Sequence, residues 1–111
     1  MLNSEWIVGC LDVGHANLVD ADVPNFIRTL GDKLKALHIH DAGHNCDFHL
    51  APYTINGEGF WNPIMKALAD INYDGELTFE ADSSVLRLPN ELKKAETKRL
   101  ETIGRYLVSK I

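Results

Sequence analysis

Strand-like and helix-like segments alternate along the chain. The strand-like segments are short and rich in apolar or β-branched residues, and they cover 6–11, 34–40 and 76–80. The helix-like segments repeat apolar residues every three or four positions, and they cover 22–31, 62–71 and 90–110. Because strands that alternate with helices in this way pair side by side, the pattern predicts an α/β fold with parallel strands.

The apolar positions also predict which side chains are buried. The first strand, 6–11, is apolar throughout, which predicts burial on both faces and makes Cys10 a buried thiol. Phe26 and Leu92 belong to the apolar stripes of the first and last helices, so we expect them to face the core. The polar stretch 82–89 predicts a loop.

Candidate chemistry is concentrated around the second strand. Residues 37–49 contain four of the five histidines of the chain. His38 and His40 lie two positions apart, so on a strand their imidazoles project from the same face. The stretch 41–59 is long and polar, which predicts a functional loop. Its ionisable residues next to the strand are Asp41, His44, Asp47 and His49.

This cluster predicts a metal site more strongly than any one of its members does. Imidazole and carboxylate groups are common ligands of divalent first-row metal ions. A single histidine on an apolar strand is more often a hydrogen-bonded core residue, so the prediction depends on the density of the cluster. Cys46 lies in the same segment and is either a soft ligand or an ordinary loop cysteine.

The other two predicted strands also end in acidic residues. Asp12 follows the first strand and Glu80 ends the third. Ligands of parallel α/β folds collect at the carboxyl ends of the strands, so we expect these carboxylates to lie near His38 and His40. Asp12 has an alternative structural role, because an aspartate at this position also caps the turn that follows, next to Gly14.

Composition limits the class of protein. The chain has 111 residues, enough for one domain, and a formal net charge of −5, which argues against a nucleic-acid partner. Its basic residues alternate with acidic ones in the last helix, as on a solvated helix surface. No signal peptide and no apolar run of membrane-spanning length is present, so the expected location is the cytoplasm, away from membranes.

Five motifs, in this order, resemble the sugar phosphate isomerase/epimerase family, the xylose isomerase-like TIM barrel group that also contains endonuclease IV. Each motif alone is unspecific, whereas the ordered set covers most of the chain. The motifs are LDVGHAN at 11–17, HIHD at 38–41, DFH at 47–49, GEG at 57–59 with Trp61, and YDGELTFE at 73–80.

The resemblance implies a divalent metal ion (Mn, Co, Zn or Mg) at the C-terminal rim of a (β/α)8 barrel. Asp12 resembles the metal carboxylate of the sixth barrel strand, and Glu80 resembles the eighth-strand glutamate, which is both metal ligand and catalytic acid/base. His38 resembles the seventh-strand metal histidine, with His40 as the alternative. The implied activity is isomerisation or epimerisation of a sugar or sugar phosphate by proton transfer α to a carbonyl, through an enediolate.

The remaining matched residues are implied to contact the substrate. His15 resembles a residue that binds substrate, assists catalysis or holds a second metal. Asp47 and His49 resemble a pair that faces substrate in the sugar enzymes and binds an additional metal in the endonuclease branch. Glu58 lies between two glycines that allow a ligand to approach the backbone, although a plain turn is equally compatible with them.

The resemblance covers only part of a barrel. A complete barrel needs about 250 residues, so the single domain at 1–111 corresponds to its last three βα units, the sixth to the eighth. The fifth-strand glutamate of the family has no counterpart, since Glu5 is the only glutamate before the first strand. We therefore expect a C-terminal portion, a split gene product or a shortened form that associates with itself or with a missing N-terminal half.

Two other functions stay open. The first is a multi-zinc phosphodiesterase of the endonuclease IV type, for which Asp12, His15, His38, Asp47, His49 and Glu80 would supply ligands. The second is a catalytically silent fragment that only binds metal or a partner chain, because one of the two acid/base glutamates of the family is absent.

Overall fold

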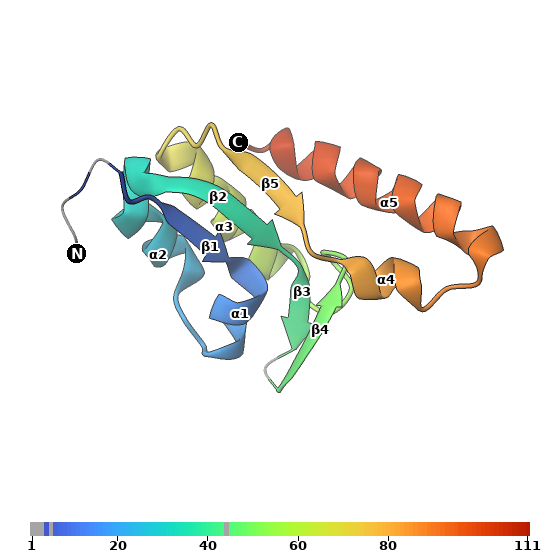
Figure 1. Cartoon of the computed structure of the whole chain (residues 1–111). Helices are drawn as coiled ribbons and strands as arrows, with labels where there is room; N and C mark the ends of the chain where they lie inside the picture. The colour runs from blue at the N-terminus through green and yellow to red at the C-terminus, as the bar shows by residue number, and fades with distance from the viewer. Residues whose placement is uncertain (1–3, 5, 44) are drawn as a thin grey trace.

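The computed structural model describes residue 4, residues 6–43 and residues 45–111 (Figure 1). The expectations for Glu5 and His44 lie outside these residues. No helix in the described part of the chain is long and apolar enough to cross a membrane.

Three parallel strands form the main sheet, as predicted. They are β1 (Gly9–Asp12), β2 (Leu34–Ile39) and β5 (Glu76–Phe79), and their order in the sheet is β1-β2-β5. The register pairs Asp12 with His38 across β1 and β2, and Ile39 with Phe79 across β2 and β5. The carboxyl ends of all three strands therefore meet at one edge of the sheet.

Helices cover one face of this sheet. They are α2 (Val23–Leu30), α3 (Glu58–Asp70) and α5 (Asn90–Val108), and Figure 1 shows α2 and α3 behind the strands. Leu11, Leu37 and Ile39 point toward the helices and are buried. They belong to one core that includes Trp61 and Leu107.

The opposite face of the sheet is open, which corrects the predicted burial of the first strand. Trp6 is 93% exposed, and β1 starts only at Gly9. Cys10 was expected to be buried but is exposed, because its side chain points to the uncovered face. The apolar run had indicated two covered faces, whereas β1 is an edge strand with helices on one side only.

The helices differ from the sequence prediction at their ends and on their outer faces. Helix α3 begins at Glu58, four residues before the predicted start, because Gly57 caps it and Trp61 is already fully buried in its first turns. Phe26 is 49% exposed and Leu92 is 52% exposed, so neither joins the core. In Figure 1 the first half of α5 extends beyond the sheet, so the strands do not cover its apolar positions.

Both predicted loops contain regular structure. The polar segment after β2 forms an antiparallel hairpin of β3 (Asp41–Gly43) and β4 (Cys46–Leu50). A short helix, α4 (Asp82–Leu86), follows β5. Another short helix, α1 (Val13–Leu18), directly follows β1 and was not predicted. These elements surround the carboxyl end of the sheet (Figure 1).

Asp41 holds the hairpin to the segment that follows it. Its carboxylate is fully buried, and one oxygen accepts hydrogen bonds from the backbone N–H groups of Thr54, Ile55 and Asn56 at 2.7–3.0 Å. The other oxygen accepts a bond from the side-chain amide of Asn56. Four donors replace the water that burial removes, so the charge is compensated. Asp41 is thus a structural residue and not a member of the ligand cluster.

We expect Asp41→Ala to lower the free energy of unfolding by about 3 kcal/mol, because it leaves buried backbone donors without an acceptor. Urea unfolding followed by circular dichroism measures this change. Asp74→Ala is the matched control, since Asp74 is exposed and its contact with Lys35 is long, at 3.8 Å; we expect it to change stability by less than about 0.5 kcal/mol. Equal losses for the two variants would contradict the role of Asp41.

Candidate metal centre

Asp12 ends β1 and caps α1. Its Oδ1 accepts a hydrogen bond from the backbone N–H of His15 at 2.8 Å, which satisfies one free donor of the helix N-terminus. Its Oδ2 lies 2.8 Å from His15 Nδ1. The predicted capping role is therefore confirmed, and the same carboxylate also faces the cluster of imidazoles.

The third strand brings Glu80 to the same edge. The backbone N–H of Glu80 donates to the Ile39 carbonyl at 3.0 Å, which continues the pairing of β5 with β2 past Phe79. His38 Nδ1 lies 2.9 Å from Glu80 Oε1 and 3.8 Å from Asp12 Oδ2. Carboxylates from two strands and an imidazole from the strand between them thus converge, as the strand ends predicted.

His40 follows β2 and is fully buried, unlike His38. Its Nε2 lies 3.0 Å from Asp12 Oδ1, and its Nδ1 lies 3.8 Å from Asp47 Oδ1. The ring packs closely on Gly14, where an added Cβ would lie 2.0 Å from Cε1. It also stacks on His49, with ring centroids 4.1 Å apart and planes 3° from parallel. Glycine at position 14 is therefore required for this position of the ring.

The hairpin adds a third carboxylate, that of Asp47, which contacts two imidazoles. Asp47 Oδ2 lies 2.9 Å from His15 Nε2 and 3.2 Å from His49 Nε2. His49 Nδ1 donates a hydrogen bond to the Glu80 carbonyl at 3.0 Å. His49 has a φ of 47°, in the left-handed region that costs a non-glycine residue on the order of 1 kcal/mol. Its neighbours hold it in this conformation despite the cost.

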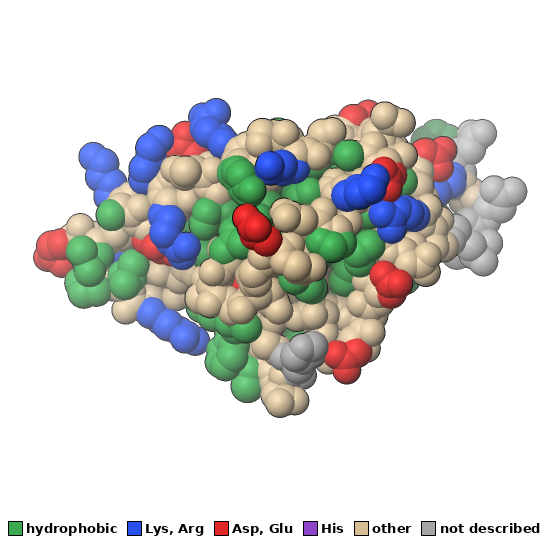
Figure 2. All heavy atoms as spheres, turned by 180° about the vertical axis from the view of Figure 1, so that it is seen from behind, with side chains coloured by type: hydrophobic (Ala, Val, Ile, Leu, Met, Phe, Trp, Pro, Cys, Tyr) green, Lys and Arg blue, Asp and Glu red, His purple; other side chains and the backbone are tan. Residues whose placement is uncertain are grey.

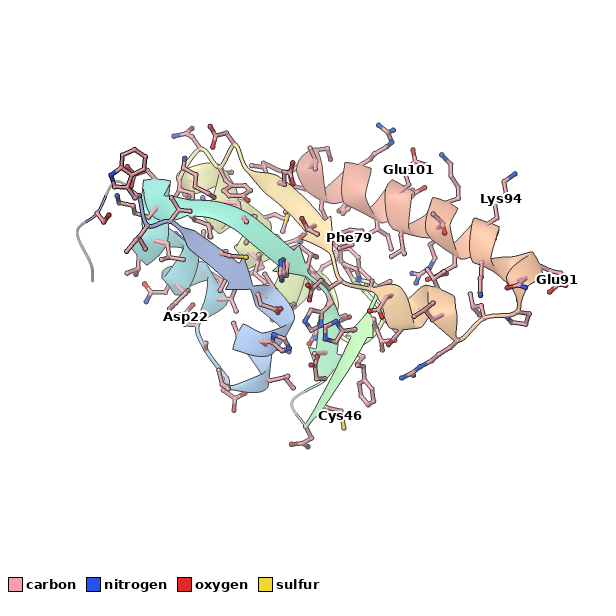
Figure 3. All side chains as sticks on the ribbon, viewed as in Figure 1. Asp22, Cys46, Phe79, Glu91, Lys94 and Glu101 are labelled. Carbon is pink, nitrogen blue, oxygen red and sulfur yellow. The ribbon has the colours of Figure 1, made fainter. Side chains whose placement is uncertain are left out.

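The donor atoms fall into two groups, each with all members within 4.8 Å of one another. The rim group comprises Asp12, His40 and Glu80, and the hairpin group comprises His15, His40, Asp47 and His49. Figure 3 shows the ring side chains crowded where the ends of β1 and β2 meet the hairpin. Nitrogen and carboxylate oxygen donors at this spacing fit a divalent first-row cation. The buried Nδ1 of His40, which has no hydrogen-bond partner among the described residues, supports this fit.

The close contacts shift the acid–base properties of the hairpin group. The hydrogen bond with Asp47 raises the pKa of His15, and the charges of Asp12, Asp47 and Glu80 raise it further, against the effect of burial. Burial alone would raise the pKa of Asp47, but its contacts with His15 and His49 outweigh burial and lower that pKa. For His49, burial lowers the pKa, yet the Glu80 carbonyl and Asp47 together raise it above its ordinary value.

Some predicted residues lie outside both groups. Glu58 is exposed in the first turn of α3, and its electrostatic effect falls on Tyr53. Cys46 begins β4 at the far end of the hairpin, where Figure 3 labels it, and among the described residues it joins neither group. His38 contacts the rim group through Glu80 and Asp12, whereas the histidine within the rim group is His40. A substrate-binding role for Glu58 stays a prediction.

Two contributors were missed from the sequence. Asp82 Oδ1 lies 3.9 Å from His49 Nδ1, and its place two positions after Glu80 is the only sequence signal for it. Asn17 is buried and donates through Nδ2 to the Ala42 carbonyl at 2.9 Å, so it ties α1 to β3. Nothing in the sequence pairs residues that are 25 positions apart.

The raised pKa of His15 predicts how stability depends on pH in the chelator-treated chain. A raised pKa stabilises the fold below the unfolded value of 6.5, and this contribution is lost as pH rises through the folded pKa. Because Asp47 is the largest cause, Asp47→Asn should move the pKa of His15 back toward 6.5 and weaken this pH dependence. NMR titration of the imidazole, with urea unfolding on both sides of pH 6.5, measures both effects. An unchanged titration in the variant would contradict the assignment.

Comparison with known proteins agrees with this architecture. An uncharacterized protein, y4fM, of Sinorhizobium fredii (strain NBRC 101917 / NGR234) is 37% identical over 78 residues, which cover 70% of this chain and 24% of that protein. The aligned part of the chain thus spans about a quarter of the length of this relative. No solved structure gives a significant match. Residues 1–103 match the family described as xylose isomerase-like TIM barrel, and the chain belongs to this family.

Proposed function

We propose that the chain forms part of the metal-binding rim of an enzyme that isomerises or epimerises a sugar or sugar phosphate. The observation that carries this proposal is the convergence of Asp12, Glu80 and two histidines from three parallel strands at one edge of the sheet. In TIM barrels this edge is where catalytic residues collect. We also propose, from the order of the motifs, that the three strands are the sixth to the eighth of a barrel.

Asp12, His40 and Glu80 would hold the cation, with His38 beside Glu80. A divalent ion bound there supplies Lewis-acid polarisation of a substrate carbonyl. The choice among Mn, Co, Zn and Mg stays open, although imidazole donors favour the transition metals over Mg.

Glu80 is the proposed acid/base. A carboxylate removes the proton α to a carbonyl, and the same or a second group returns it to the other face or to the adjacent carbon. His38 Nδ1, 2.9 Å from Oε1, fixes the orientation of Glu80. The second acid/base group is expected from another strand of the barrel.

His15, Asp47 and His49 form the proposed substrate-facing wall. The side chain of His15 is half exposed, and its contact with Asp47 orients the imidazole. A positioned imidazole N–H donates a hydrogen bond to a substrate oxygen and so stabilises the charge that develops on it. In this proposal Glu80 transfers the proton, His15 stabilises the developing charge, and Asp12 and His40 help to hold the cation.

A phosphodiesterase of the endonuclease IV type is the second candidate. The hairpin group favours it, because His15, Asp47 and His49 bring three donors within reach of one additional cation. The formal charge of −5 opposes it, since a DNA-binding rim needs clustered basic side chains. Three zinc ions in a complete site, with cleavage of abasic DNA, would establish this alternative.

We expect Glu80→Gln to slow exchange of the α-hydrogen of a ketose substrate with solvent by about 10³-fold in the protein that carries this chain. Deuterium incorporation measured by NMR or mass spectrometry provides the rate. Glu76→Gln is the matched control, because Glu76 begins the same strand at the opposite, exposed end. Retained exchange in Glu80→Gln would reject the assignment, and cleavage of abasic DNA without any exchange would favour the phosphodiesterase.

We also propose association with further βα units, from a second copy of the chain or from another chain. The edges of β1 and β5 have no pairing strand among the described residues. Beside β5, a hollow of about 800 Å³ is lined by apolar side chains such as Leu77, Phe79 and Leu100 and also by the charged side chains of Glu101 and Arg105. Figure 2, the view from behind, shows apolar side chains near the centre of the surface and basic ones on both sides of them.

Unpaired strand edges and uncovered apolar surface favour assembly. We therefore expect the 111-residue chain to sediment as a species larger than a monomer at micromolar concentration. Lys substitutions at both Leu77 and Phe79, which place charge in the hollow, should shift the distribution toward monomer. A monodisperse monomer of the unmodified chain would contradict self-association.

A further inference from the structure

His40 is the residue that the two ligand groups share. On the side of the rim group, its Nε2 lies 3.0 Å from Asp12 Oδ1. On the side of the hairpin group, its Nδ1 lies 3.8 Å from Asp47 Oδ1. The two nitrogens of one imidazole therefore face two different carboxylates, and each of these carboxylates belongs to a different group.

The hydrogen-bonding pattern around His40 is incomplete in a way that a cation would complete. Asp12 is an acceptor, so Nε2 must carry the ring proton that it receives, and Nδ1 of the neutral ring then presents a lone pair. A carboxylate oxygen of Asp47, which is a second acceptor, lies 3.8 Å from this nitrogen. Nδ1 is buried without a hydrogen-bond partner among the described residues, which is unfavourable for a polar atom removed from water.

A metal ion relieves this conflict because both acceptors can bind it. Zinc bonds imidazole nitrogen and carboxylate oxygen at about 2.0–2.2 Å, so one ion can join atoms up to roughly 4 Å apart. The 3.8 Å separation of Nδ1 and Asp47 Oδ1 falls inside that limit. His15, whose ring plane lies 76° from that of His40, supplies a further nitrogen to the same group, whereas the parallel stacking of His49 on His40 prevents both of these rings from directing a lone pair at one ion.

The ring cannot turn away to find another partner. It is fully buried, packs on the backbone of Gly14 and stacks on His49. His49 is itself held in the left-handed region by its contacts. Both nitrogens of His40 therefore keep their directions, one toward Asp12 and the other toward Asp47.

We propose that His40 bridges two divalent cations, binding one through Nε2 together with Asp12 and Glu80, and the other through Nδ1 together with Asp47 and His15. The inference rests on the proposed function, because the first cation is the one assigned to catalysis. Binding of both ions forms two metal–nitrogen bonds and breaks the single N–H bond of the neutral ring. The proton leaves to solvent, and no electron is transferred. Borderline first-row ions such as Zn²⁺, Cu²⁺ and Co²⁺ suit such a bridge, whereas Mg²⁺ and Ca²⁺ do not.

The test uses Cu²⁺ as the probe ion on the 111-residue chain after removal of metals with a chelator. We expect two copper ions per chain by elemental analysis. Their unpaired electrons should be coupled through the imidazolate, which lowers the electron paramagnetic resonance intensity below that of two isolated ions. His40→Gln should abolish the coupling. His38→Gln, which alters the neighbouring histidine of the same segment, should preserve it.

The outcomes separate this inference from the function on which it rests. Two bound ions with full, uncoupled intensity in the unmodified chain would overturn the bridge while leaving a metal-dependent function intact. Coupling that survives His40→Gln and disappears in His38→Gln would overturn the assignment of the bridge to His40 and would assign it to His38. A chain that binds no divalent ion would overturn both proposals. Because the unmodified chain is itself decisive, the test does not depend on whether the buried His40→Gln variant folds.

Discussion

The carboxylate of Asp12 is the interaction on which the site and its surroundings depend. One oxygen accepts a hydrogen bond from the backbone N–H of His15, which caps α1, and another from Nε2 of His40. The other oxygen contacts the imidazole of His15. The same group therefore starts a helix, fixes a buried ring and orients an exposed one. A partly buried carboxylate needs such partners because its desolvation is costly. Its structural and chemical roles follow from the same hydrogen bonds.

The parallel sheet explains why the other ligands come to Asp12. Parallel strands that run in register deliver the residues at their carboxyl ends to one edge, and the β1–β2–β5 order places His38 between Asp12 and Glu80. The hairpin then closes over this edge and adds Asp47 and His49. The chemistry of the site thus arises from elements that are distant in sequence, and the two groups of donors share one buried ring.

Helices cover only one face of the main sheet. The hydrophobic core lies between the strands and these helices, while the other face carries the exposed side chains of Cys10 and Thr78. In a closed barrel that face is interior and is filled by side chains from all strands. The chain belongs to a TIM barrel family, and a sheet with one open face and polar groups at the carboxyl ends of its strands resembles the inner side of such a barrel.

The sequence alone determined the α/β class, the three parallel strands and the meeting of Asp12, Glu80 and the histidines, because these follow from local periodicity and the geometry of parallel pairing. It did not determine that residues 6–8 are exposed, since an apolar run reads the same whether one face or both are covered. Tertiary structure decided three further features: the hairpin, the burial of the Asp41 carboxylate and the burial of His40. Each depends on a partner far along the chain: Asn56 for Asp41, Gly14 for His40, and Glu80 for His49. Local pattern predicts which groups reach the edge of the sheet, whereas packing between distant segments sets where each one points.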